Sequence, residues 1–281
     1  MNDIPSIVRK GFASIGNVNL KSDDTVVIKP NLCCIKGPET GATTDPRVVE
    51  GIIEYLRNDI GISSIFVVES DGTQLLADMA FKLLGYERLS KRLNIKLINL
   101  SKASYSVKKF DDNVFLKKIR VPHVLEEADC IISVPKIKIH DLCSFTATMK
   151  NQFGCNPRPR KIVYHKRMHD SIVDLNVAFR PHLVVVDGIV AMEGNGPIDG
   201  IPVIMNTLIF GRDPVAVDHL IARIMGINPR HVEYLVQAQK RGIGTIEYET
   251  VGTNLGEINT KFMGPTNQRN LYRMFSRDHG D

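Results

Sequence analysis

Short runs of β-branched and aliphatic residues alternate with amphipathic helical patterns along most of this chain. The apolar runs lie at 25–28, 65–68, 95–100, 130–134, 183–186 and 208–210. Asp–Pro pairs at 45–46 and 213–214 are typical of an N-cap followed by the first residue of a helix. Apolar strands that alternate with helices predict an α/β fold: a largely parallel, doubly wound sheet with helices on both faces and an inserted smaller lobe.

The organisation we expect is a single α/β domain over residues 1–261, followed by a polar C-terminal tail over 262–281. The inserted lobe would come from 100–121 or 141–180. The N-terminus lacks the apolar segment of a signal peptide, and no apolar run approaches the roughly 20 residues that span a bilayer. We therefore expect a cytoplasmic protein without a membrane partner.

Basic residues are concentrated between positions 136 and 169. This segment holds eight Lys or Arg residues and one acid, Asp141, whereas the rest of the chain has 28 basic and 30 acidic residues. Such a local excess favours a site for a small anion over a generally basic surface. Aromatic residues make up only 6% of the chain, which disfavours nucleic acid as a partner because base stacking needs aromatic rings.

The ends of the predicted strands carry charged and amide side chains. In an open parallel sheet, ligands bind beyond the carboxyl ends of the strands. After the 130–134 run, the sequence PKIKIH at 135–140 places Lys136, Lys138 and His140 on one face if it stays extended. Two ammonium groups and an imidazole on one face repel each other unless an anion or carboxylates lie between them. The alternative interpretation is a solvated strand edge.

Three sets of side chains are candidate metal ligands. They are Asp187 with Glu193, His165 with His169, and the cysteines Cys33, Cys143 and Cys155. The carboxylates would supply oxygen ligands to a divalent ion, and the two histidines would lie one helical turn apart. The cysteines would have to meet in space, because none forms a CxxC motif. A structural turn, a basic surface helix and reduced buried thiols are the respective alternatives.

Seven motifs occur in order along the chain. They are VVIKPNL at 26–32, TTDPRVV at 43–49, VVES at 67–70, EADCIISVPKIKIH at 127–140, TATMKNQFG at 146–154, VVDGIVAMEGNGP at 185–197 and GRDPVAVD at 211–218. Together they resemble the family catalogued as domain of unknown function 362. Many members carry a ferredoxin-like segment with closely spaced cysteines, which implies redox chemistry. This chain has no CxxCxxC run.

From the residues and the resemblance we predict an enzyme that binds an anionic small molecule, a phosphate or a carboxylate, with metal-assisted or redox chemistry. The predicted catalytic residues are His140, Lys136 and Lys150. The predicted anion- or substrate-binding residues are Lys29, Asn31, Thr44, Lys138, Asn151 and Asn195. The expected cofactor is a divalent metal or an iron–sulfur cluster, and a redox protein is an expected partner. The alternative function is a non-catalytic protein of electron transfer or metallocentre assembly.

Overall fold

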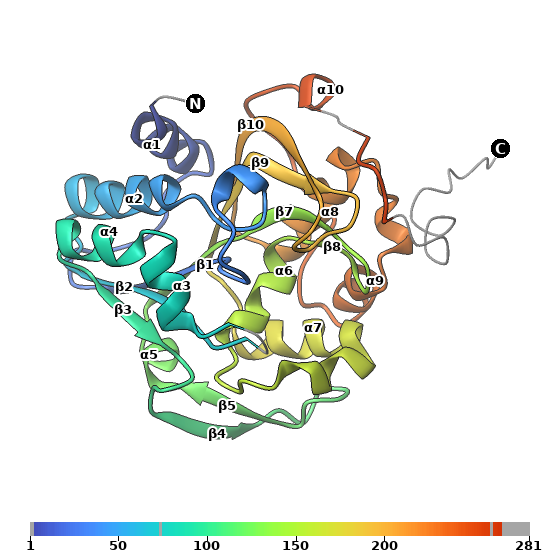
Figure 1. Ribbon diagram of the computed structural model, residues 1–281, viewed down its shortest axis with the longest axis horizontal. Helices are drawn as coiled ribbons and strands as arrows, with labels where there is room; N and C mark the ends of the chain where they lie inside the picture. Colours follow the sequence, from blue (N-terminus) through green and yellow to red (C-terminus); the bar gives the residue numbers. More distant parts are fainter. Residues whose placement is uncertain (1–2, 73–74, 259–260, 266–281) are drawn as a thin grey trace.

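One eight-stranded sheet runs through the computed structural model, which describes residues 3–72, 75–258 and 261–265 (Figure 1). Its strands are β1 (Thr25–Pro30), β2 (Ser64–Glu69), β3 (Lys96–Asn99), β6 (Cys130–Val134), β7 (Lys136–His140), β8 (Ser144–Thr146), β9 (Leu183–Glu193) and β10 (Ile201–Gly211). The order is β3-β2-β1-β6-β9-β7-β8, with β10 paired to β9. Only β8 and β10 are antiparallel to their neighbours, so the prediction of a largely parallel sheet is confirmed.

Helices cover both faces of this sheet. One face packs on α1 (Ile4–Ser14), α2 (Pro46–Tyr55) with the turn η2 (Leu56–Ile60), α3 (Ala77–Leu83) and α4 (Tyr86–Leu93). The other packs on α5 (His123–Glu126), α6 (Thr148–Asn151), η3 (Gln152–Cys155), η4 (Lys161–Arg167), α7 (Met168–Ala178), α8 (Pro214–Ile224), η5 (Pro229–His231) and α9 (Glu233–Lys240). The short elements η1 (Pro38–Thr40) and α10 (Leu255–Ile258) complete the order. Within β1, Val26 and Ile28 enter the first core and Val27 the second, as the two-residue period of a strand requires.

The inserted lobe is a separate hairpin of β4 (Tyr105–Lys109) and β5 (Lys118–Pro122), which corresponds to the first of its two predicted locations, 100–121, and extends one residue beyond it. Asp174 anchors the loop between these strands. Its fully buried carboxylate accepts the backbone amides of Phe115 and Leu116, each at 2.7 Å, and forms an ion pair with Arg241 at 2.8 Å. One carboxylate of α7 therefore holds the lobe on the second core.

Element boundaries differ from the sequence prediction in two places. The helical spacing over 74–84 predicts one helix, but α3 begins at Ala77 and a further helix, α4, begins directly after Gly85. Only Leu84 and Gly85 join the two helices, and the left-handed conformation of Gly85 (φ 85°) turns the chain from one into the next. Gln74 and most of the expected tail over 262–281 lie outside the described residues. Within the described ranges, every helix is too short or too polar to cross a lipid bilayer.

Asp213 caps the N-terminus of α8, as the Asp–Pro pair predicted. Its carboxylate accepts the amides of Val215 at 2.8 Å, Ala216 at 3.2 Å and Thr245 at 3.1 Å. Asp213→Ala leaves these amides without their acceptor, and we expect the free energy of unfolding to fall by about 1–2 kcal/mol in urea denaturation. Asp23→Ala, an exposed aspartate in a loop, should change it by less than about 0.5 kcal/mol. Equal stability of the two variants would contradict this capping role.

Candidate functional site

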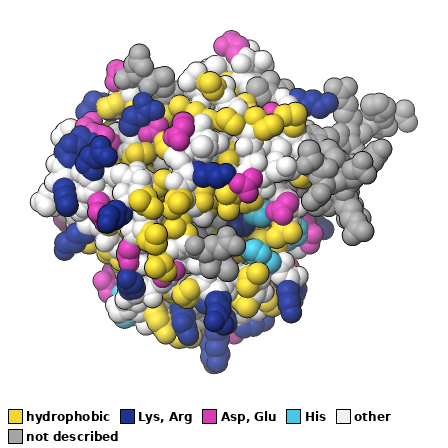
Figure 2. Space-filling view, viewed as in Figure 1, with side chains coloured by type: hydrophobic (Ala, Val, Ile, Leu, Met, Phe, Trp, Pro, Cys, Tyr) yellow, Lys and Arg dark blue, Asp and Glu magenta, His cyan; other side chains and the backbone are white. Residues whose placement is uncertain are grey.

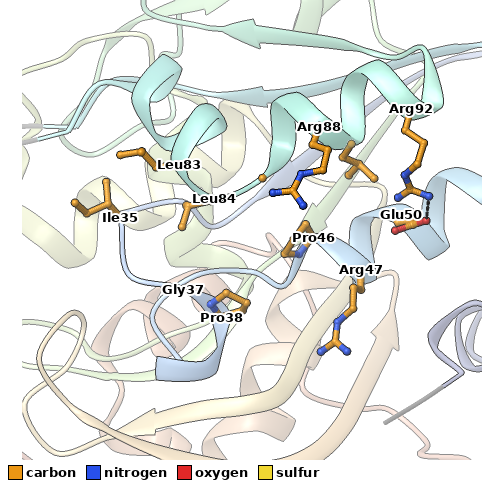
Figure 3. A pocket seen from close by; sticks show the side chains of 12 residues that line it. Ile35, Gly37, Pro38, Pro46, Arg47, Glu50, Leu83, Leu84, Arg88 and Arg92 are labelled. Atoms are coloured by element: carbon orange, nitrogen blue, oxygen red, sulfur yellow. Dashed lines mark hydrogen bonds and ion pairs between the residues drawn. The ribbon is translucent and has the colours of Figure 1, made fainter.

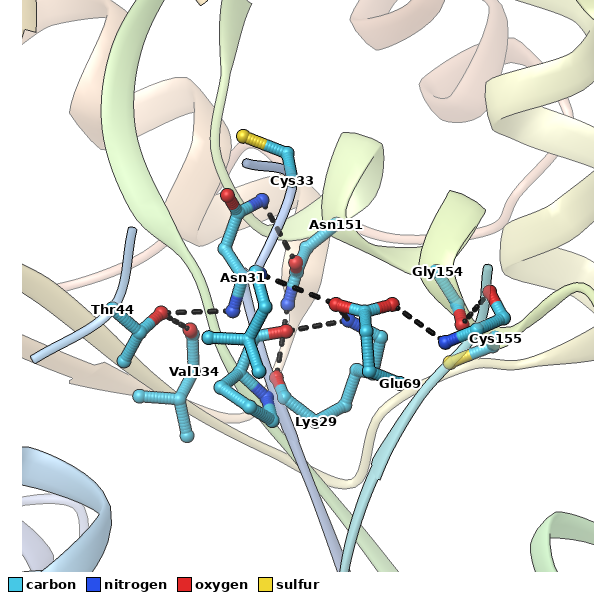
Figure 4. A network of polar contacts seen from close by, with 12 residues as sticks. Lys29, Asn31, Cys33, Thr44, Glu69, Val134, Asn151, Gly154 and Cys155 are labelled. Carbon is cyan, nitrogen blue, oxygen red and sulfur yellow. Dashed lines mark hydrogen bonds and ion pairs between the residues drawn. The ribbon is translucent and has the colours of Figure 1, made fainter. Parts of the chain in front are cut away.

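Lys29 and Glu69 form a buried ion pair where β1 and β2 end side by side (Figure 4). Nζ lies 2.7 Å from Oε2, and the side chains are 1% and 7% exposed. The Glu69 carboxylate also accepts the amides of Ser70 at 2.9 Å and Leu32 at 3.2 Å. Gly154 packs against the pair so closely that a Cβ there would lie 2.3 Å from Lys29 Cε, so only glycine fits without displacement. The pair is therefore a rigid part of the site.

A second buried pair joins β7 to β9. Lys136 Nζ lies 2.9 Å from Asp187 Oδ2, and both side chains are fully buried. The Asp187 carboxylate also accepts the amide of Asp45 at 2.8 Å and that of Ile189 at 3.0 Å. Asp187 was predicted as a metal ligand, but its two oxygens bind an ammonium group and two amides of the protein. These contacts tie the start of α2 to the centre of the sheet.

Lys138 is as deeply buried as Lys29 but has no carboxylate within ion-pair distance among the described residues. Its Nζ donates to Asn31 Oδ1 at 3.0 Å, to the Ala42 carbonyl at 2.8 Å and to Cys33 Sγ at 3.2 Å. A buried ammonium group bonded to two neutral oxygens and a sulfur leaves a positive charge inside the site without a carboxylate partner.

Asn31 and Asn151 connect these lysines across 120 residues of sequence (Figure 4). Asn31 Nδ2 donates to Asn151 Oδ1 at 3.1 Å, and Asn151 Nδ2 donates at 3.0 Å to both the Lys29 carbonyl and Ser133 Oγ. Thr44 Oγ1 accepts the Asn31 amide at 2.8 Å. The structure thus brings together three predicted binding residues, Asn31, Thr44 and Asn151. Each of them bonds within the protein, where it positions the strand ends.

Lys150 and Lys161 are half-buried at the edge of this network. Lys150 Nζ lies 4.0 Å from the centre of the Phe153 ring, and burial lowers the pKa of Lys150, with further lowering from Lys138 and Lys29. Burial also lowers the pKa of Lys161 to about 8, despite the opposing charge of Glu69. Lys161 Nζ is hydrogen-bonded to Ser70 Oγ. In the described part of the chain, neither ammonium group has a carboxylate within ion-pair distance.

His140 lies at the end of β7 and is 7% exposed. Its Nδ1 is 3.0 Å from an oxygen of Asp141, yet burial outweighs this carboxylate and lowers the pKa of His140 to about 4. The imidazole is therefore neutral at pH 7. Lys150 and Lys138 contribute to the lowering of the His140 pKa, so the imidazole lies near both of them. We call Lys138, Lys150 and Lys161 the cationic cluster. Asn195, the remaining predicted binding residue, is exposed in the turn between β9 and β10.

The predicted metal-binding side chains do not assemble. Glu193 accepts the Met263 amide at 2.9 Å. His165 is exposed in the 3-10 segment η4 and His169 lies in α7, so they do not share one α-helix as the sequence interpretation assumed. Cys143 and Cys155 are buried, and burial raises the pKa of each thiol to about 12. In the ranges that the structure describes, no three His, Cys, Asp or Glu side chains group closely enough to hold a metal ion.

Two cavities of about 390 Å³ each flank the 35–38 segment. The first is lined by the exposed apolar side chains of Ile35 and Leu83 and by Arg88 and Arg92, which project from α4 (Figure 3). The face drawn in Figure 2 carries hydrophobic side chains over its centre and Lys and Arg mainly toward its left and lower margins. The second cavity reaches Lys136. Neither is lined by Lys150 or Lys161, so the cationic cluster is a separate feature of the surface.

Three residues that organise the site were given no role from the sequence: Glu69, Lys161 and Asp218. The fully buried Asp218 of α8 accepts the amides of Thr148 at 2.7 Å and Met149 at 3.0 Å, which fixes the start of α6 and with it Lys150. Glu69 and Asp218 both lie within motifs, VVES and GRDPVAVD. Acidic residues inside apolar motifs are the signal that could have identified them.

A protein family, a protein sequence and a solved structure are similar to this chain. A family model described as domain of unknown function (DUF362) matches residues 26–223. A thylakoid-associated protein of Synechocystis sp. is 28% identical over 239 residues, which cover 83% of this chain and 72% of that protein. The lactate racemase apoprotein of Thermoanaerobacterium thermosaccharolyticum aligns with 12% identity and a TM-score of 0.48 over 74% of this chain. The alignment spans 52% of the racemase chain, about half its length.

The buried Lys29–Glu69 pair predicts an asymmetry between single and double substitutions. Lys29→Met leaves the Glu69 carboxylate buried without its counter-charge, and we expect a loss of about 3–5 kcal/mol in the free energy of unfolding. Lys29→Met combined with Glu69→Gln removes both charges and should recover part of that loss. Lys36→Met, which breaks an exposed pair with Asp199, should change stability by less than about 1 kcal/mol. Urea denaturation at pH 7 measures all three, and a double variant as unstable as Lys29→Met would contradict the prediction.

His140 predicts a pH dependence of stability. Its folded-state pKa of about 4 lies below the ordinary value of 6.5, so the unfolded chain binds the proton more tightly. The stability contributed by the neutral imidazole is complete above pH 6.5 and falls as the pH drops from 6.5 toward 4. We expect His140→Gln to flatten the stability profile between these pH values in urea denaturation. An unchanged slope would show that other groups cause the loss.

Proposed function

The chain belongs to the family described as domain of unknown function 362, and we propose that it binds a small phosphate- or carboxylate-containing molecule beside the ends of β1, β2 and β7. Lys150 and Lys161 contact the anion in this proposal. The buried Lys138 contributes positive charge without touching the anion. Asn31 and Asn151 connect β1, β6 and β7 to α6, and the Lys29–Glu69 pair connects β1 to β2. Lys136 pairs with Asp187 and serves the scaffold, without contact to the anion.

The observation that carries this proposal is the unequal pairing of five lysines. Lys29 and Lys136 have buried carboxylate partners. Lys138, Lys150 and Lys161 have none within ion-pair distance in the described residues, and burial with mutual repulsion lowers the pKa of Lys150 and Lys161. Like charges in a partly desolvated region repel strongly, and a bound anion removes the repulsion by supplying the missing negative charge. Phosphate and carboxylate oxygens also accept the remaining ammonium hydrogens.

We further propose that the site is catalytic, with His140 and Lys161 as the groups that exchange protons with the bound molecule. A neutral imidazole accepts a proton, and an amine with a pKa of about 8 is present in both protonation states near neutral pH. Lys150 would then stabilise negative charge that develops on the substrate. No metal ion is required for these steps, and none of the three predicted ligand sets contributes to them.

Anion binding is tested with inorganic phosphate, pyrophosphate and malonate by isothermal titration calorimetry. We expect at least one of these anions to bind the wild-type protein, and Lys150→Gln and Lys161→Gln each to weaken its binding at least about tenfold, or about 1.4 kcal/mol. Lys166→Gln, an exposed lysine of the same basic segment, is the matched control and should bind like the wild type. If none of the anions binds, or if both site variants bind as tightly as the control, the proposal is wrong.

Proton uptake supplies a second signature of the same site. A bound anion favours the charged form of Lys161 and raises its pKa above about 8, so binding at pH 8 draws a proton from the buffer. The apparent binding enthalpy should then depend on the ionisation enthalpy of the buffer in the wild type and in Lys166→Gln. Lys161→Gln should remove most of this dependence. A buffer dependence that survives Lys161→Gln would assign the proton to another group.

A further inference from the structure

Cys33 lies at the mouth of the cationic cluster, in the segment between β1 and η1. The residue is exposed, and its Sγ accepts a hydrogen bond from Lys138 Nζ at 3.2 Å. The sulfur also lies 3.6 Å from the Ala42 carbonyl oxygen. Cys33 therefore combines an exposed position with a hydrogen bond to its sulfur from a buried ammonium group.

The geometry around Lys138 identifies the charge state of this sulfur. An ammonium group has three N–H donors, and those of Lys138 go to Asn31 Oδ1, to the Ala42 carbonyl and to Cys33 Sγ. Amide and carbonyl oxygens carry no net charge, so the sulfur is the only one of the three acceptors that can neutralise the buried cation. A 1% exposed ammonium group without a counter-ion is strongly unfavourable, which favours the thiolate form of Cys33.

On balance, the groups around Cys33 lower its pKa and so favour the thiolate form. Interaction with Cys34 and the charge of Lys138 lower the pKa of Cys33 to about 5, against the opposing effects of burial and, to a smaller extent, of Glu69. Glu69 is itself neutralised by Lys29. The charge of Cys33 in turn works to raise the pKa of Lys150, so Lys150 is a second cation near the sulfur. The pKa of Cys34 is raised by its interaction with Cys33.

We propose that Cys33 is a nucleophilic thiolate that forms mixed disulfides with anionic low-molecular-weight disulfides, of which glutathione disulfide is the model compound. The Cys33 sulfur attacks one sulfur of the disulfide, a new S–S bond forms, the original S–S bond breaks, and the second half leaves as a thiolate. The disulfide is the only oxidant that this exchange needs. Lys138 stabilises the attacking thiolate, and Lys150 attracts the carboxylates of the reagent and stabilises the negative charge as it moves to the leaving group.

This inference goes beyond anion binding and is separable from it. The exchange reaction itself depends on the contact between Cys33 and Lys138, and only its selectivity for anionic reagents shares Lys150 with the proposed function. The other cysteines provide internal controls, since Cys130, Cys143 and Cys155 are buried and burial raises the pKa of each to about 12. A protein that exchanges disulfides at Cys33 but binds no phosphate, pyrophosphate or malonate would refute only the proposed function.

The first experiment is the pH profile of alkylation by iodoacetamide, followed by mass spectrometry of the labelled peptides. We expect Cys33 of the wild-type protein to be labelled half-maximally below about pH 7, far from the value of about 8.5 for a free thiol. Lys138→Met should move the midpoint upward by at least about one pH unit. Cys34→Ser keeps a hydroxyl donor beside the sulfur and should retain the low midpoint. A wild-type midpoint near 8.5 overturns the proposal, even if Lys138→Met does not fold.

The second experiment compares glutathione disulfide, which is anionic, with cystamine, which is cationic. We expect the anionic reagent to modify Cys33 at least about fivefold faster at low ionic strength, and the ratio to fall toward one in high salt. Lys150→Gln should lower the ratio, and the matched control Lys166→Gln should leave it unchanged. Cys33→Ser should abolish the modification. If cystamine reacts as fast as glutathione disulfide with the wild type, the selectivity for anions is refuted.

Discussion

The burial of positive charge at the centre of the sheet is the constraint on which the rest of this structure depends. A parallel sheet covered by helices on both faces places the carboxyl ends of its strands in a largely desolvated region. Lys29, Lys136 and Lys138 enter that region from β1 and β7, and each must find acceptors there. The carboxylates of Glu69 and Asp187 neutralise two of them, and these carboxylates also bind backbone amides that fix neighbouring loops. The same carboxylates therefore offset the free-energy cost of burying the lysines and position the loops.

The sequence was informative wherever a local rule decides the structure. The alternation in 135–140 predicted that Ile137 and Ile139 would enter the core, and both are fully buried. The Asp–Pro pairs predicted the starts of α2 and α8, since an N-cap and a proline at the first helical position are local signals. The apolar runs predicted the strands, because a strand covered on both faces has to be apolar almost throughout.

The roles of individual polar residues could not be predicted, because they are set by partners far away in sequence. Asn31 and Asn151 look like ligand-binding amides until their contact with each other is known. The spacing of His165 and His169 suggests one turn of a single α-helix, but His165 lies in a 3-10 segment and His169 in α7, and spacing alone does not report that change of helix type. The sequence indicates a role for Cys33 only in combination with other cysteines, whereas its side chain contacts Lys138, 105 residues along the chain.

The position of Asp218 in the chain has a consequence for the order in which the site is completed during synthesis. The strands β1, β2, β6 and β7 leave the ribosome before the two carboxylates that organise their surroundings, Asp187 and then Asp218, have been made. Until α8 emerges, the amides at the start of α6 lack their acceptor, and Lys150 is held by no fixed helix. The nascent chain therefore carries Lys136 without its carboxylate partner until Asp187 has been made, and the start of α6 without its acceptor until Asp218 has been made.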